Sequence, residues 1–129
     1  MKRRLTLAMA LIATSLLLSF MIGLPGKASE EEEINKLIES ASTPEDHMKL
    51  ADYYEKEAEK MEVKSSSHSS IADSYRTRAR PLTEHFQLDQ KKVYTELAIH
   101  CSNLSKEYKE AAEEYRAMAA EHKEMAEEM

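Results

Sequence analysis

The chain has 129 residues, of which 33% are charged, and a formal net charge of −6. This length allows one domain, and the acidic balance argues against nucleic acid as a partner, because binding to phosphates requires a basic face. Both glycines and one of the three prolines lie before residue 29, so the remainder has a composition typical of helices.

The first 28 residues have the pattern of an export signal. A basic start from Lys2 to Arg4 precedes an apolar run over residues 5–24, and small residues at Gly26 and Ala28 suit a signal peptidase. The same run is long enough to serve as an uncleaved membrane anchor instead. Cleavage would remove four basic residues and no acidic one, which takes the formal charge from −6 to −10. We therefore expect an exported, periplasmic or secreted protein that meets a membrane only if this segment is retained.

A short helix is predicted next, over about residues 30–42. Ser29 suits the N-cap, and the four glutamates after it suit the first turn, where the helix dipole favours negative charge. Apolar residues then recur at helical spacing, namely Ile34, Leu37, Ile38 and Ala41. These features predict the first element of a single helical domain that spans residues 29–129.

Two long helices follow. A cap at Thr43 and a proline at Pro44 predict a second helix over about 44–79, which a later proline ends. Its weakest stretch is the serine-rich segment 65–70, because serine competes with the helix for hydrogen bonds. We interpret that segment as a seam of small residues that lets another helix approach closely. A third helix is predicted over about 89–129, after a short connector.

The two long helices share one pattern. Segments 47–72 and 101–126 match at an offset of about 54 positions, as in an internal repeat. Each segment carries a row of residues seven apart, which is the spacing of a coiled coil. The rows are His47, Tyr54, Met61 and His68 in the first segment, and Cys101, Tyr108, Tyr115 and His122 in the second.

An antiparallel hairpin would bring these rows together in a single register. If His47 faces His122, then His68 faces Cys101, and the midpoint of the register falls just after Glu84, inside the connector. A hairpin must turn there, so the register agrees with the predicted helix bounds. We therefore predict an all-α fold, a long antiparallel helical hairpin with a short N-terminal helix.

The seam of this hairpin is rich in Tyr, Met and Ala and poor in Leu, Ile and Val. The register places Tyr54 near Tyr115 and Tyr75 near Tyr94. A bare hairpin with so small a core needs further helices, supplied by the short N-terminal helix or by a second copy of the chain. We expect a dimeric four-helix bundle, with a three-helix fold as the alternative.

Four seam residues are candidate metal ligands: His47, His68, Cys101 and His122. Imidazole and thiolate are good ligands for copper and zinc. The register divides them into a His/His half-site at the open end and a His/Cys half-site nearer the turn, separated by about 32 Å of helix. A two-fold dimer that doubled each end would supply four ligands. Alternatively, they are partly exposed polar ends of a coiled coil, since no Glu-x-x-His bundle signature is present.

Cys101 has further interpretations. As the sole cysteine of an exported chain, it could be a buried small residue, a free thiol or half of an intermolecular disulfide. A nucleophilic role is disfavoured, because no oxyanion-hole signature or nucleophile elbow accompanies it. The sequence carries no other catalytic motif, so we expect a non-enzymatic protein.

The motif His-Cys-x-x-Leu from His100, the pair Ala111 and Ala112, and His-x-x-Met-Ala from His122 resemble a pattern in small exported bacterial helical-hairpin proteins of unknown function. The resemblance covers mainly residues 97–126 and implies no activity. The leading hypothesis is therefore association of the hairpin with itself or with an envelope protein. The alternative is a periplasmic protein that binds copper or zinc through its His/Cys half-sites.

Overall fold

A computed structural model describes residues 29–129, so the predicted export signal lies outside the described residues. This part of the chain contains three α-helices and no strand. They are α1 (Glu30–Ser40), α2 (Pro44–Ala79) and α3 (Leu88–Glu128), with a short 3-10 helix, η1 (His85–Gln87), before α3. Between residues 29 and 129 we find no helix with the length and apolar character needed to span a membrane.

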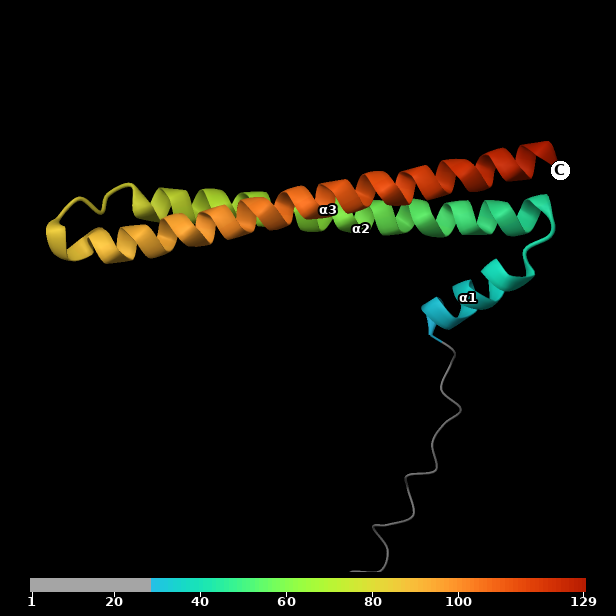
Figure 1. The fold of residues 1–129 in the computed structure, drawn as a ribbon, viewed down its shortest axis with the longest axis horizontal. Helices are drawn as coiled ribbons and strands as arrows, with labels where there is room; N and C mark the ends of the chain where they lie inside the picture. The colour runs from blue at the N-terminus through green and yellow to red at the C-terminus, as the bar shows by residue number, and fades with distance from the viewer. Residues whose placement is uncertain (1–28) are drawn as a thin grey trace, which may run out of the picture. The chain divides into compact units, whose positions relative to one another are not determined.

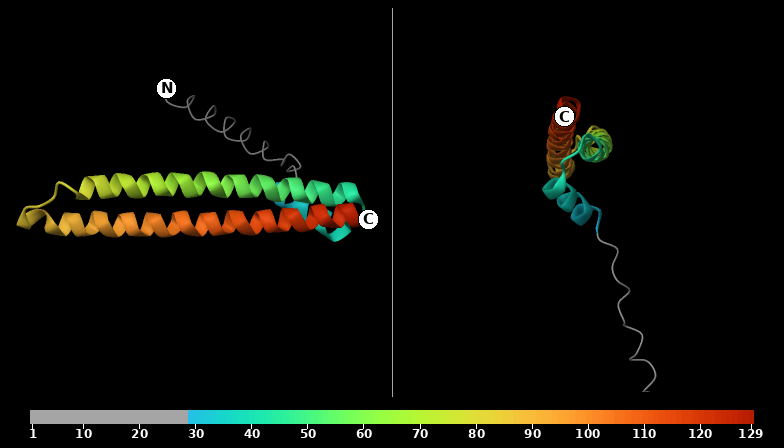
Figure 2. Two further views of the ribbon diagram at one scale, coloured as in Figure 1. Left: turned by 90° about the horizontal axis from the view of Figure 1, so that it is seen from above. Right: turned by 90° about the vertical axis from the view of Figure 1, so that its right-hand side faces the viewer.

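Helices α2 and α3 form the hairpin, within a compact unit that spans Ile34–Met129. Figures 1 and 2 show the two helices antiparallel and side by side, with the start of α2 next to the end of α3. At about 1.5 Å per residue, the 36 residues of α2 and the 41 residues of α3 are each more than 50 Å long. The predicted all-α hairpin with a short N-terminal helix is confirmed.

The break between α1 and α2 lies where the side chain of Thr43 caps α2. Thr43 has an extended backbone, its hydroxyl accepts a hydrogen bond from the Asp46 N–H at 3.2 Å, and the Asp46 carboxylate accepts one from the Thr43 N–H at 3.2 Å. This reciprocal arrangement is a capping box. Because the chain must leave the helical conformation before the cap, α1 ends at Ser40, two residues earlier than the sequence pattern predicted.

A ladder of small residues lines the contact between α2 and α3. Helix α2 runs through the serine-rich segment without a break. The ladder has one small residue per seven on each helix: Ala51, Ala58, Ser65, Ala72 and Ala79 on α2, and Ala98, Ser105, Ala112 and Ala119 on α3. All of its alanines are buried, with exposed fractions of 6% or less.

The two serines of the small-residue ladder show how closely the helices approach. Ser65 Oγ donates a hydrogen bond to the Ser105 carbonyl oxygen at 2.8 Å and lies 3.2 Å from Ser105 Oγ. So short a side chain reaches the opposite backbone only where two helix axes come near the lower end of the usual range of about 8–10 Å. Ser65 therefore belongs to the helix contact, whereas the other serines of segment 65–70 are exposed, so the seam interpretation holds for Ser65 alone.

Aromatic contacts establish the register independently. The rings of Tyr54 and Tyr115 stack with centroids 6.2 Å apart, and those of Tyr75 and Tyr94 stack at 6.3 Å. Both pairs were expected from the antiparallel register, and both are confirmed. The turn lies between Ala79 and Leu88, where the midpoint of that register falls.

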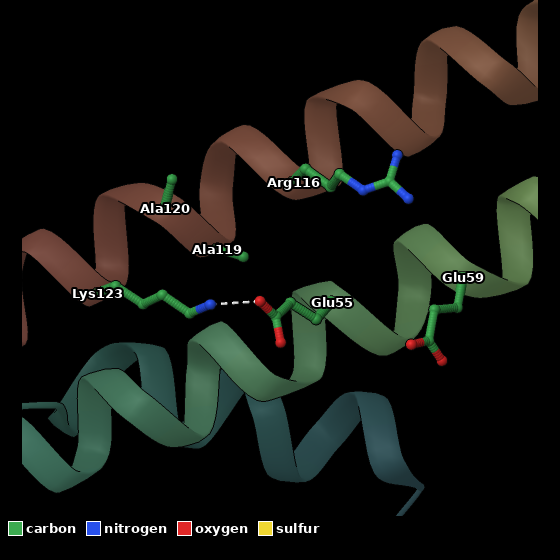
Figure 3. Close-up of a pocket in the computed structure, with 6 residues that line it drawn as sticks. All are labelled: Glu55, Glu59, Arg116, Ala119, Ala120 and Lys123. Carbon is green, nitrogen blue, oxygen red and sulfur yellow. Dashed lines mark hydrogen bonds and ion pairs between the residues drawn. The ribbon is translucent and has the colours of Figure 1, made fainter.

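The two sides of the hairpin carry different residues. On one side, which we call the charged edge, Glu62 pairs with Arg116 at 2.5 Å and Glu55 pairs with Lys123. Figure 3 shows Lys123 reaching across from α3 to Glu55 on α2. On the other side, apolar residues of α3 spaced seven apart form a row that we call the apolar edge. It consists of Leu97, Leu104, Ala111, Met118 and Met125, with Ile71 from α2.

Candidate functional site

The open end of the hairpin brings together two of the four predicted ligands. His47 is the fourth residue of α2, and His122 lies in the last two turns of α3. Their Nδ1 atoms are 3.1 Å apart, and their rings stack with centroids at 5.4 Å. The antiparallel register causes this meeting, since the two residues are 75 positions apart in the sequence. The expected His/His pair is therefore present.

A cluster of tyrosine rings adjoins His122 of this pair. Tyr54 stacks on His122 with centroids 5.6 Å apart and planes inclined by 11°, and it also stacks on Tyr115. Tyr53 meets the ring of Tyr54 edge-on at 5.3 Å. Tyr54 thus covers one face of the His122 ring, while His47 contacts the same imidazole.

The environment lowers the pKa of His122 from its ordinary value of 6.5. Burial is the largest cause, and the nearby charge of His47 is the second, while the Glu121 carboxylate acts in the opposite direction. At 3.1 Å, one Nδ1 donates a hydrogen bond and the other accepts it, and the tautomers decide which ring is the donor. A neutral or singly protonated pair satisfies this contact, whereas two protonated rings would repel each other.

The second expected pair is arranged differently. The ring of His68 stacks on the ring of Tyr108, with centroids 5.4 Å apart. Tyr108 lies seven residues after Cys101 on α3. Lys64 Nζ lies 5.4 Å from the centre of the same tyrosine ring. Nδ1 of His68 is buried without a hydrogen-bond partner, and no hydrogen bond joins His68 to Cys101 in the described chain. Cys101 is a half-buried free thiol. The ring contact that the structure shows for His68 is therefore with Tyr108, one heptad from Cys101.

Within residues 29–129, no three or more His, Cys, Asp or Glu side chains lie close enough together to hold a metal ion. The four predicted ligands consequently form at most half-sites within one chain. Two imidazoles at the open end are short of the four ligands that a structural zinc ion takes. Any metal centre would need additional ligands from outside the hairpin.

Two shallow grooves follow the charged edge. The first, of about 430 Å³, is lined by carboxylates of α2 and by cations and alanines of α3. Figure 3 draws these residues: Glu55, Glu59, Arg116, Ala119, Ala120 and Lys123. The hydrogen bond to Glu55 is the largest cause of a raised pKa of Lys123. The charges on opposite walls therefore neutralise each other across this groove.

The second groove, of about 390 Å³, lies near the turn and has cationic walls. Its lining residues are Arg76, Ala79, Arg80, Lys91, Thr95, Ala98 and Ile99. Sequence reasoning missed this groove, although the signal was present as a cluster of arginines and lysines on both sides of the connector. No protein-family model, curated protein or solved structure matches the chain.

Proposed function

We propose that this protein is a non-enzymatic hairpin that acts by association, with a second copy of itself or with another envelope protein. The apolar edge of the hairpin is the surface that makes the contact. The proposal rests on the size of the apolar side chains, which are small in the interior of the hairpin and larger on its surface. Among the residues described, the buried ones are Leu50 and seven alanines, whereas much larger apolar side chains remain exposed.

The size of the buried residues explains why an additional contact is needed. Burying a Leu, Ile or Met side chain stabilises a fold by about 1.5–3 kcal/mol, while an alanine methyl contributes about 0.8 kcal/mol or less. On the apolar edge, Ile71, Leu104 and Met125 keep 40%, 38% and 48% of their surface exposed. No residue of α1 is buried. Covering the apolar edge would therefore add the large apolar contacts that the hairpin itself does not contain.

The two edges of the hairpin have different roles: the charged edge joins α2 to α3, and the apolar edge is the surface proposed for association. Ion pairs across the charged edge join α2 to α3 with exposed polar groups, which water solvates well. Lys64, seven residues before Ile71 on α2, places its Nζ 5.4 Å from the centre of the Tyr108 ring. An apolar stripe bordered by polar residues is typical of a helix face that packs in a bundle. The proposal includes export, for which the pattern of residues 1–28 is the support.

Substituting Leu104 by lysine tests the proposed contact. We expect the protein to sediment as an assembly whose size falls on dilution, and Leu104→Lys to weaken that assembly by roughly a hundredfold or more. The reason is that an unpaired charge buried in a contact costs several kcal/mol. The control is Val63→Lys, at an exposed apolar position of α2 outside the apolar edge, with 71% of its surface exposed.

The control should associate like the parent protein. If the parent chain sediments as a monomer at every concentration and captures no partner from envelope extracts, association is wrong. If assembly persists in Leu104→Lys and is lost in Val63→Lys, the protein associates through a different face.

A second candidate function is binding of copper or zinc at the open end, and the geometry of the His47–His122 pair favours it. Two nitrogen ligands at about 2.0–2.1 Å from a tetrahedral ion lie about 3.3 Å apart, close to the 3.1 Å between the two Nδ1 atoms. A second copy that joined its open end to the first would supply two further imidazoles. His68 and Cys101 would form a separate, weaker pair.

Metal retention tests the second candidate. After equilibration with zinc or copper and removal of the excess, the parent protein should retain metal and melt at a higher temperature, because a ligand that binds only the folded state stabilises it. His122→Ala should lose both effects, while the exposed His100→Ala should keep them. Equal retention by the parent and His122→Ala, or no retention by the parent, would exclude a metal site at the open end.

A further inference from the structure

The turn end of the hairpin has the opposite charge to the rest of the described chain. We define the basic tip as residues 76–95, which contain five cations and two acidic residues, a net charge of +3. The other residues from 29 to 129 contain nine cations and twenty-two acidic residues, a net charge of −13. The cations of the basic tip are Arg76, Arg78, Arg80, Lys91 and Lys92. The molecule therefore has a positive end and a negative body.

Helix stability accounts for only part of this cluster. Arg76 and Arg78 lie in the last turn of α2, where the helix dipole favours positive charge. Lys91 and Lys92 lie close to the first turn of α3, where the same dipole disfavours it. Lys92 is 77% exposed, and its ion pair with Glu96 is long, at 4.0 Å. An anion outside the chain can therefore approach this cation.

The cationic groove of the basic tip offers a place for such an anion. Arg76, Arg80 and Lys91 border it, and its lining contains no carboxylate. Arg76 is held in place by Asp73 at 2.7 Å and by Ser102 Oγ at 2.6 Å. The floor of the groove is apolar, which suits a ligand that has an anionic group next to a hydrocarbon part.

Large apolar side chains lie exposed beside these cations. Leu88 and Val93 in the basic tip keep 46% and 52% of their surface exposed, and Ile99 on the groove floor keeps 53%. Cations next to exposed apolar residues are the combination that binds the interface of an anionic membrane. Nucleic acid would gain nothing from the apolar residues and would be repelled by the acidic body.

We propose that the basic tip docks on the surface of an anionic phospholipid bilayer. Arg76, Arg80 and Lys91 bind the headgroup phosphates, and Leu88 and Val93 enter the boundary between headgroups and acyl chains. The acidic body is repelled by the same surface, so the hairpin contacts the bilayer by its turn. This contact leaves the apolar edge free and does not depend on the association proposed above.

Vesicle binding by charge variants tests the role of the cations. The triple variant Arg76→Gln, Arg80→Gln, Lys91→Gln, which removes the three cations of the groove, should bind phosphatidylglycerol vesicles roughly a hundredfold more weakly than the parent full-length chain, because each cation near an anionic surface contributes about 1 kcal/mol. The matched control, Lys49→Gln, Lys106→Gln, Lys109→Gln, removes the same charge from the body of the hairpin and should bind like the parent. Any affinity of the first 28 residues for lipid is common to all three proteins.

A fluorescent reporter tests which end touches the bilayer. The chain contains no tryptophan, so Leu88→Trp reports on the basic tip alone, and Val63→Trp, at another exposed apolar position, is the control. The emission of Leu88→Trp should shift to the blue and be quenched by brominated phosphatidylglycerol at low salt, and the effect should weaken at high salt. Val63→Trp should not respond.

Three results would overturn the proposal. The first is no change in the emission of Leu88→Trp when phosphatidylglycerol vesicles are added. The second is an equal change in that emission with neutral phosphatidylcholine vesicles. The third is equal affinity of the two triple variants for phosphatidylglycerol vesicles. Capture of an acidic protein by the basic tip together with a silent Leu88→Trp would assign the tip to that protein and exclude the bilayer.

Discussion

Replacing Ala112 by leucine is expected to lower the free energy of unfolding by about 1–3 kcal/mol. Ala112 is 1% exposed and belongs to the small-residue ladder. The Ser65–Ser105 contact places Ala58, also 1% exposed, in the same layer, because each lies seven residues from one of the serines. Three added carbon atoms have no space between helices that approach this closely, so the helices must separate or the side chain must adopt a strained rotamer.

The same substitution at Ala117 is the control. Ala117 lies on the exposed face of α3, and Ala117→Leu should change the unfolding free energy by less than about 0.5 kcal/mol. Urea unfolding followed by circular dichroism measures the unfolding free energy of both variants. In a thermal scan, each kcal/mol lost from that free energy should lower the melting temperature by about 4–8 °C for a domain of this size. Equal stability of the two variants would show that the ladder is not a close contact in solution.

Acid is expected to destabilise the open end of the hairpin through His122. Burial, followed by the charge of His47, holds the pKa of His122 below 6.5 in the folded chain. The folded state therefore binds fewer protons at this site than the unfolded state does. The contribution of His122 to stability is fully present above about pH 6.5, the ordinary pKa of the group, and is lost as the pH falls through the lowered pKa of the folded state.

Melting curves recorded between neutral pH and pH 5 measure this effect. The melting temperature of the parent protein should fall as the pH decreases, and His122→Gln should show a smaller fall, because glutamine does not titrate. His100→Gln, at an exposed position of the same helix, should keep the parent dependence. The same slope in the parent and in His122→Gln would mean that other groups cause the acid sensitivity.

Carboxylates act in a separate pH range. The hydrogen bond from Thr43, followed by that from the Ser42 backbone, lowers the pKa of Asp46 from 3.8. Its contribution is present above that pH and is lost on further acidification, as the pH falls through the lowered pKa of the folded state. The fall in stability assigned to His122 therefore lies below about pH 6.5, at higher pH than the loss assigned to Asp46.

The hairpin could be predicted because the residues that define it recur at a fixed spacing along each helix. Residues seven apart place one row on one helix face, and two such rows allow one antiparallel register with the turn in the connector. The contacts of His47 with His122, of Tyr54 with Tyr115 and of Tyr75 with Tyr94 follow from that register alone. The end of α1 was predicted two residues late, because the periodicity did not reveal how much chain the Thr43 cap requires.

The partner of His68 could not be predicted in this way. The register places Cys101 opposite His68, but the ring stacks on Tyr108, one heptad away, and Tyr54 likewise contacts His122 one heptad beyond Tyr115. Long side chains lean along the helix axis, so they reach residues in the next layer. A register assigns layers, whereas the rotamers in the packed hairpin decide which rings touch.

The sequence by itself therefore determined the helices, their antiparallel register and the row of candidate ligands, because each depends on spacing along one helix. Only the tertiary structure decided which side of the hairpin becomes the charged edge and which the apolar edge, since that depends on the rotation of each helix about its axis. It also decided that Arg76 of α2 and Arg80, the residue that follows α2, share a groove with Lys91 of α3. Charges on two helices act on one ligand only when the fold brings them to the same surface.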